Sequence, residues 1–188
     1  MNYEALARTV VEWLKNGNNW HRAVSLDIEG DLRMLEGQKR FPLSITIARR
    51  IRNEIEIRPF ILEEETIEDE VRLLGELGSA FQEIRPLMLI GFGIGRFDLP
   101  VLSLKLQELD NLYRGEGKLP NWYWGIRDAV TRSYVLDIVD PVRFELARHD
   151  GTTPRSVRLE HAISHERFKH LPLMKTKHLV SSRTDRGN

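Results

Sequence analysis

The chain has 188 residues, of which 41% are apolar and 30% charged, with a formal net charge of zero and no cysteine. A chain of this size is expected to form a single domain that spans residues 1–188. The apolar runs are too short for a membrane span, the N-terminus does not resemble a signal peptide, and disulfides and thiolate metal sites are excluded. We therefore expect a cytoplasmic protein without a membrane partner.

The first part of the chain predicts one helix and three strands. Residues 3–15 carry apolar side chains at helical spacing and end in a polar turn, which gives an N-terminal helix and turn over 1–19. Alternating apolar and polar residues then predict strands at about 22–29, 42–51 and 54–62. The last two strands are expected to pair as a hairpin.

The remainder predicts helices that alternate with strands. A helix is expected at about 66–84, because Thr66 followed by Asp69 is a variant of the capping box. Further elements are predicted as a strand at 87–91, a helix at 98–113, a strand at 134–139 and a helix at about 155–168. This order predicts an α/β fold with a mixed five-stranded sheet, antiparallel first strands and flanking helices.

Three acidic residues are candidates for a metal site. Asp27 and Glu29 lie on the same side of the first strand, where their charges repel unless a cation or proton intervenes. Asp98 begins a helix after the glycine-rich turn 91–95, so its side chain is a candidate either for a helix cap or for a ligand. Oxygen-only ligands at the carboxyl ends of these strands favour Mg²⁺ or Mn²⁺.

Two segments resemble a known family. Asp27-Ile28-Glu29 and the stretch Gly91 to Leu102 are similar to the first two motifs of the DEDD superfamily of 3′–5′ exonucleases. The second motif resembles the G-[FYH]-N-I-x-x-F-D-x-P-x-L pattern of the proofreading domain of family B DNA polymerases. The resemblance covers residues 20–172 and implies a ribonuclease H-like fold in which Asp27, Glu29 and Asp98 hold two catalytic Mg²⁺ or Mn²⁺ ions. It also implies weaker substrate contacts at Ile28, Gly93, Arg96 and Phe97.

Two departures from the family pattern affect the expected site. Gly93 stands where the pattern has Asn, and no Tyr-x-x-x-Asp or His-x-x-x-x-Asp motif follows residue 140. We therefore expect the site to lack a fourth carboxylate and to hold its second ion weakly. We also expect the exonuclease core to lack its last helix. Self-association or a partner chain could complete that helix. Asp137 and Asp140 are candidate auxiliary residues, with strand-end turns as the simpler interpretation.

The C-terminal quarter is basic. From Arg143 to Asn188 there are ten Lys and Arg against five Asp and Glu, and residues 173–188 form a polar basic tail. Basic segments bind phosphate, although many are simply solvated. His161 and His165 have a spacing that can bind zinc, but surface histidines are the simpler interpretation.

The sequence thus predicts a metal-dependent 3′–5′ exonuclease that acts on single-stranded nucleic-acid ends, with DNA as the expected substrate. The alternative is a catalytically inactive module with the same fold that binds nucleic acid or docks a partner.

Overall fold

The computed structural model describes residues 12, 15, 19–30, 42, 44–151 and 157–168. Apart from Glu12 and Lys15, the helix expected at 3–15 lies outside the described residues, as does the tail 173–188. The chain divides into two compact units, residues 1–138 and 139–188, and the predicted core 20–172 extends over both.

The first unit contains a five-stranded mixed sheet. Its strands are β1 (Ala23–Glu29), β2 (Ser44–Ile51), β3 (Glu54–Ile61), β4 (Met88–Gly91) and β5 (Tyr134–Asp137), and a short 3₁₀ helix, η1 (Trp20–Arg22), precedes β1. The strand order is β3-β2-β1-β4-β5. β2 pairs antiparallel with both β1 and β3, whereas β4 pairs parallel with both β1 and β5. The predicted α/β class and mixed sheet with antiparallel first strands are confirmed.

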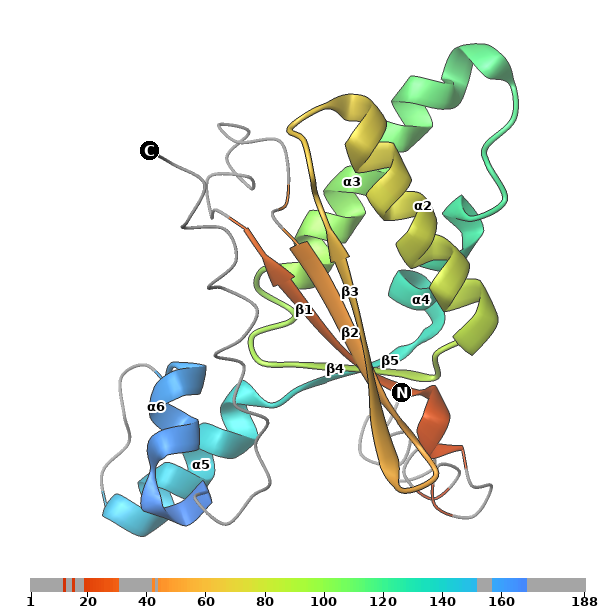
Figure 1. Cartoon of the computed structure of the whole chain (residues 1–188). Helices are drawn as coiled ribbons and strands as arrows, with labels where there is room; N and C mark the ends of the chain where they lie inside the picture. The colour runs from red at the N-terminus through yellow and green to blue at the C-terminus, as the bar shows by residue number, and fades with distance from the viewer. Residues whose placement is uncertain are drawn as a thin grey trace, which may run out of the picture. The chain divides into compact units, whose positions relative to one another are not determined.

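Three helices of this unit pack beside the sheet (Figure 1). They are α2 (Ile67–Ile84), α3 (Asp98–Tyr113) and α4 (Tyr123–Arg132), with the 3₁₀ turn η3 (Arg114–Glu116) after α3. α2 begins as predicted, because the Thr66 side chain accepts a hydrogen bond from the Asp69 N–H at 3.2 Å. The bounds of α2 and α3 agree with the predicted bounds within one residue. α4 was not predicted.

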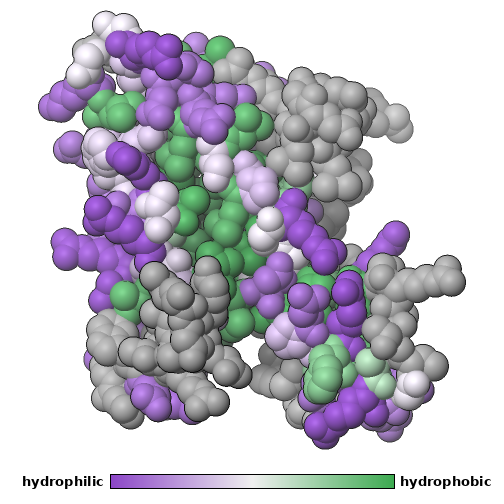
Figure 2. Space-filling model, turned by 180° about the vertical axis from the view of Figure 1, so that it is seen from behind, coloured by the Kyte–Doolittle hydropathy of each residue, from purple (hydrophilic) through white to green (hydrophobic). Residues whose placement is uncertain are grey.

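The sheet buries its two faces unequally. The main core contains the inward residues of β1 and β2 together with apolar side chains of α2, α3 and α4. A smaller cluster is formed by Ala23 and Met88 with neighbouring side chains of β4 and β5. β3 leaves Ile55, Ile57 and Ile61 exposed. Seen from behind, apolar residues are concentrated in the middle of the first unit and polar residues at its margins (Figure 2).

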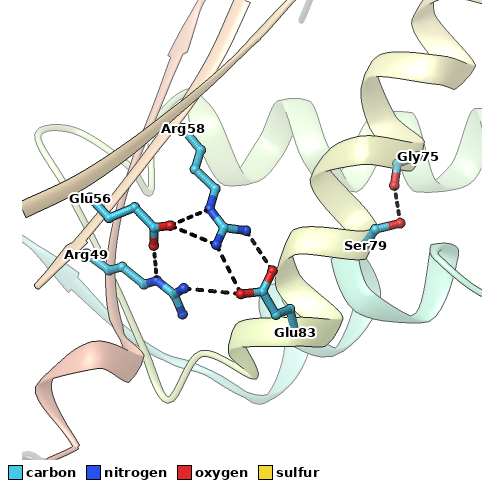
Figure 3. A network of polar contacts seen from close by, with 6 residues as sticks. All are labelled: Arg49, Glu56, Arg58, Gly75, Ser79 and Glu83. Carbon is cyan, nitrogen blue, oxygen red and sulfur yellow. Dashed lines mark hydrogen bonds and ion pairs between the residues drawn. The ribbon is translucent and has the colours of Figure 1, made fainter. Parts of the chain in front are cut away.

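An ion-pair network joins the β2–β3 hairpin to α2 (Figure 3). Glu83 of α2 accepts hydrogen bonds from Arg58 at 2.7 Å and from Arg49 at 3.2 Å. Glu56 of β3 also accepts a hydrogen bond from each of these arginines. These arginines hold the pKa of both Glu56 and Glu83 below the usual range. The network is partly exposed, so it orients the hairpin more than it stabilises the fold.

The second unit is helical in its described residues. It contains α5 (Val139–Asp150), α6 (Leu159–Ser164) and the 3₁₀ turn η4 (Glu166–Phe168). The strand predicted at 134–139 ends earlier, at Asp137, and α5 was not predicted. The helix predicted at about 155–168 is represented by α6 and η4. None of the helices among the described residues is long and apolar enough to cross a membrane.

Helices α2 and α4 approach each other through two glycines. A Cβ atom on Gly125 would overlap the Gly78 carbonyl oxygen, and one on Gly78 would overlap the backbone of Trp122. The backbones can therefore pack this closely only because neither position carries a side chain.

We expect Gly125→Ala to destabilise the protein by about 3 kcal/mol or more, because the overlapping atom is backbone and α4 must shift away from α2. The measurement is the free energy of unfolding in urea. Gly115→Ala is the matched control, since a Cβ there meets nothing within 4 Å, and it should change stability by less than about 1 kcal/mol. Equal losses in both variants would contradict the close helix contact.

Candidate functional site

The candidate site lies at the carboxyl end of β1. Along this strand Val24, Leu26 and Ile28 are buried, while Asp27 and Glu29 are exposed on the opposite face. Asp27 lies opposite Thr46 of β2, and Glu29 lies opposite Ser44. The predicted alternation is therefore confirmed, and the two carboxylates leave the sheet on the same side.

Asp98 reaches this end of β1 from a distant part of the sequence. Its Oδ1 atom accepts a 2.7 Å hydrogen bond from the backbone N–H of Ile28, and the Asp98 residue is 5% exposed. The parallel pairing of β1 with β4 ends at Ser25 and Ile90. Asp98 thus satisfies a strand N–H at a point where β4 provides no further partner.

The hydrogen bond changes the interpretation of Asp98 as a helix cap. Asp98 is the first residue of α3, and the cap position is Phe97, which makes no side-chain capping bond. The Asp98 carboxyl instead joins the start of α3 to the middle of the Asp27-Ile28-Glu29 triplet. These two segments, 70 residues apart in the sequence, therefore lie side by side.

Asp137 holds the turn between β4 and α3. It lies opposite Gly91 at the end of β5. Its Oδ1 accepts a hydrogen bond from Gly93 N–H at 2.9 Å, and its Oδ2 accepts one from Gly95 N–H at 3.4 Å. Asp137 therefore fixes the backbone of the segment that leads into Asp98.

The other predicted residues have different surroundings. The Ile28 side chain is buried in the core, Phe97 packs against that core, and Arg96 is exposed in the turn. Asp140 belongs to the second unit, in the first turn of α5, where Arg143 lies 3.6 Å away. The other auxiliary candidate, Asp137, contacts the Gly91–Asp98 segment of its own unit.

Negative charge accumulates at this site. Burial, together with the charges of Asp27 and Asp137, raises the pKa of Asp98 to about 6, although the hydrogen bond from Ile28 opposes this change. Partial removal of water by the surrounding protein also raises the pKa of Asp27, although this residue is exposed. A carboxylate whose pKa is raised by burial and by neighbouring negative charge is stabilised in its ionised form by a nearby cation.

The donor set fits a hard divalent cation. All candidate ligand atoms are carboxylate oxygens, which Mg²⁺ and Mn²⁺ prefer over nitrogen or sulfur donors. The carboxylates of Asp27, Glu29 and Asp98 are not yet compact. Within the described part of the chain, the one group of three potential metal ligands whose ligand atoms lie within 4.8 Å of one another contains two histidines and one aspartate and lies in the second unit.

We expect Asp98→Asn to stabilise the protein at neutral pH in the presence of a chelator. The folded-state pKa of about 6 exceeds the ordinary value of 3.8, so the contribution of Asp98 to stability falls as pH rises from about 4 to about 6. An amide keeps an acceptor for Ile28 N–H and carries no charge. Above pH 7 the variant should gain about 1–2 kcal/mol after allowance for solvent screening.

Urea unfolding of the parent and Asp98→Asn from pH 4 to pH 8 measures this difference. The two proteins should be equally stable near pH 4 and diverge as pH rises. A gain that does not change with pH would show that the Asp98 charge is not the cause.

Comparison with known proteins assigns no family. No protein-family model matches the chain, and no curated protein matches it significantly.

Proposed function

We propose that the chain is a metal-dependent 3′–5′ exonuclease with a ribonuclease H-like fold, acting on single-stranded ends of nucleic acid, with DNA as the expected substrate. The observation that carries the proposal is the 2.7 Å hydrogen bond from Ile28 N–H to Asp98 Oδ1. Ile28 stands between Asp27 and Glu29, so this bond joins the two sequence motifs that resemble those of DEDD exonucleases. The lack of cysteine also fits a cytoplasmic enzyme.

Each carboxylate has a distinct part in this proposal. Asp27 and Glu29 offer oxygens from one strand face, and Asp98 offers an oxygen from a side chain that the Ile28 hydrogen bond keeps in place. When bound there, a pair of Mg²⁺ or Mn²⁺ ions would activate water and stabilise the leaving oxygen of a phosphodiester. Asp137 acts as a positioning residue, because both of its oxygens accept N–H groups of the glycine turn.

The number of carboxylates limits the expected activity. Asp27, Glu29 and Asp98 provide one negative charge fewer than the four-carboxylate site that the resemblance implies. A site with fewer ligands holds its second ion more weakly, and Mg²⁺ gives up its hydration water reluctantly. We therefore expect weak activity that is higher with Mn²⁺ than with Mg²⁺.

The first unit also offers a surface for unpaired bases. A hollow of about 640 Å³, here called the α3–α4 hollow, is lined by residues that include Tyr113, Arg114, Lys118 and Trp124. Trp124 is 43% exposed, and the Arg127 guanidinium lies 4.9 Å from its ring centroid. Exposed aromatic rings with nearby cations suit stacked bases and phosphates.

The hollow lies at the far end of α3 from the carboxylates. Asp98 begins α3 and Tyr113 ends it, and 16 helical residues span about 24 Å. A strand whose 3′ end lies at Asp98 would therefore have to extend along the helix before its upstream bases reach Trp124. This separation makes the contribution of Trp124 dependent on substrate length.

We expect Asp27→Ala to lower Mn²⁺-dependent nuclease activity at least about a hundredfold, because it removes a metal ligand. The assay follows shortening of a 5′-labelled single-stranded oligonucleotide, and a melting curve shows whether the variant is folded. Asp128→Ala is the control, since Asp128 is an exposed residue of α4 paired with Arg132. If Asp27→Ala keeps full activity, or if it unfolds, the assigned role of Asp27 is wrong.

We expect Trp124→Ala to weaken binding of a long single-stranded oligonucleotide about tenfold, within the range for loss of one stacked base. Binding of a trinucleotide should not change, because a short strand cannot extend from Asp98 to the hollow. Fluorescence anisotropy with Ca²⁺ in place of Mn²⁺ measures both affinities without turnover. Trp20→Ala is the matched control, since Trp20 is 39% exposed and lies outside the hollow.

A binding module without catalysis is the second candidate. It is favoured by the spread of the Asp27, Glu29 and Asp98 carboxylates, which are not within 4.8 Å of one another in the described structure. Retained binding of single-stranded oligonucleotide with no turnover in Mn²⁺ would select this function.

A further inference from the structure

Three side chains of the second unit meet outside the carboxylate site. His149 and Asp150 are the last two residues of α5, and His165 follows the end of α6. Between the helices, Gly151 has a φ of 70°, in the left-handed region that favours glycine, and its N–H bonds the Ala147 carbonyl. α5 therefore stops directly after Asp150, and the chain can return to bring His165 to the same place.

The three side chains converge on one oxygen atom. Asp150 Oδ1 lies 2.8 Å from His149 Nδ1 and 3.2 Å from His165 Nε2. The imidazole rings are 5.1 Å apart and nearly perpendicular. One ligand atom from each side chain lies within 4.8 Å of the other two.

These distances suit a tetrahedral metal site. With metal–ligand bonds of about 2.0–2.1 Å, neighbouring ligand atoms of a tetrahedron are about 3.3 Å apart. The 3.2 Å distance from Asp150 to His165 is close to this value, whereas the 2.8 Å distance from Asp150 to His149 is shorter. A ligand nitrogen of each histidine lies within 4.8 Å of the other, and His149 is exposed and His165 half-buried, so these side chains can adjust to an ion.

The donor types select a different metal from that of the carboxylate site. Two imidazole nitrogens and one carboxylate oxygen are typical ligands of Zn²⁺, whereas Mg²⁺ prefers oxygen alone. Three protein ligands leave the fourth tetrahedral position for water or another donor.

A bound metal would add stability to the second unit. Among the side chains of this unit whose burial the structure describes, the buried apolar ones are those of Val139, Leu146 and Ala162. Phe144 and Leu159 are both exposed. Small units with thin cores are commonly stabilised by disulfides or metals, and this chain has no cysteine.

We propose that His149, Asp150 and His165 form a Zn²⁺ site that links the end of α5 to the end of α6. This site differs from the His161–His165 pair suggested by helical spacing, because His165 here uses ligands from fifteen and sixteen residues earlier. It is also independent of the proposed exonuclease function. The site would stabilise the second unit and contribute no residue to the carboxylates of the first.

The test is titration of the full chain with Zn²⁺, followed by calorimetry and by thermal melting. We expect one tightly bound ion per chain at this site and a higher melting temperature. His149→Gln and His165→Gln should each weaken binding at least about tenfold, since even loss of a residue that only orients a ligand costs about 10–100-fold. The absorption spectrum of bound Co²⁺ should show tetrahedral coordination in the parent and lose it in both variants.

Matched controls separate this site from other histidines and from the carboxylates. His161→Gln and His21→Gln should bind Zn²⁺ as the parent does, and Asp27→Ala should also keep the site while it loses nuclease activity. Melting in chelator shows that each variant is folded. The proposal is overturned if no Zn²⁺ binds, if every variant binds equally, or if His161→Gln weakens binding while His149→Gln does not.

Discussion

The hydrogen bond between Ile28 N–H and Asp98 Oδ1 is the constraint on which the first unit's site depends. It uses a strand N–H beyond the last β1–β4 pair, so it adds to the sheet without competing with it. Since Ile28 is buried and Asp98 begins α3, the bond fixes the helix start relative to the strand that carries Asp27 and Glu29. This hydrogen bond, which contributes about 1.5–3 kcal/mol, thereby fixes the relative positions of two residues that are 70 positions apart in the sequence.

The same arrangement has an electrostatic cost. Burial alone raises the pKa of Asp98, and the charges of Asp27 and Asp137 raise it further. A fold selected only for stability would place an apolar or amide side chain at such a position. A buried carboxyl with a raised pKa is a typical sign of a functional site, and a cation bound beside it would offset the cost of its charge.

The sequence predicted the elements with strong local signals. The β2–β3 hairpin and α2 have clear alternation or capping, and α3 follows a glycine turn with Pro100 in its first turn. α4 was missed because Gly125 interrupts the helical pattern, and because its aromatic residues Tyr123 and Trp124 do not by themselves indicate a helix. α5 was missed because the apolar run of β5 continues to Val139, whereas the strand ends at Asp137. The His149–Asp150–His165 group could not be predicted, since only the reversal at Gly151 brings it together.

The backbone of Gly93 requires a residue that tolerates a left-handed conformation. Its φ of 80° lies in the left-handed region, where glycine is favoured and asparagine is among the few other residues tolerated. Glycine therefore suits the turn between β4 and α3. Asp137 fixes this turn from β5, because its carboxylate accepts hydrogen bonds from the Gly93 and Gly95 N–H groups, and its charge contributes to the raised pKa of Asp98. The position of Asp98 at the candidate site thus depends on a residue of the edge strand as well as on the Ile28 hydrogen bond.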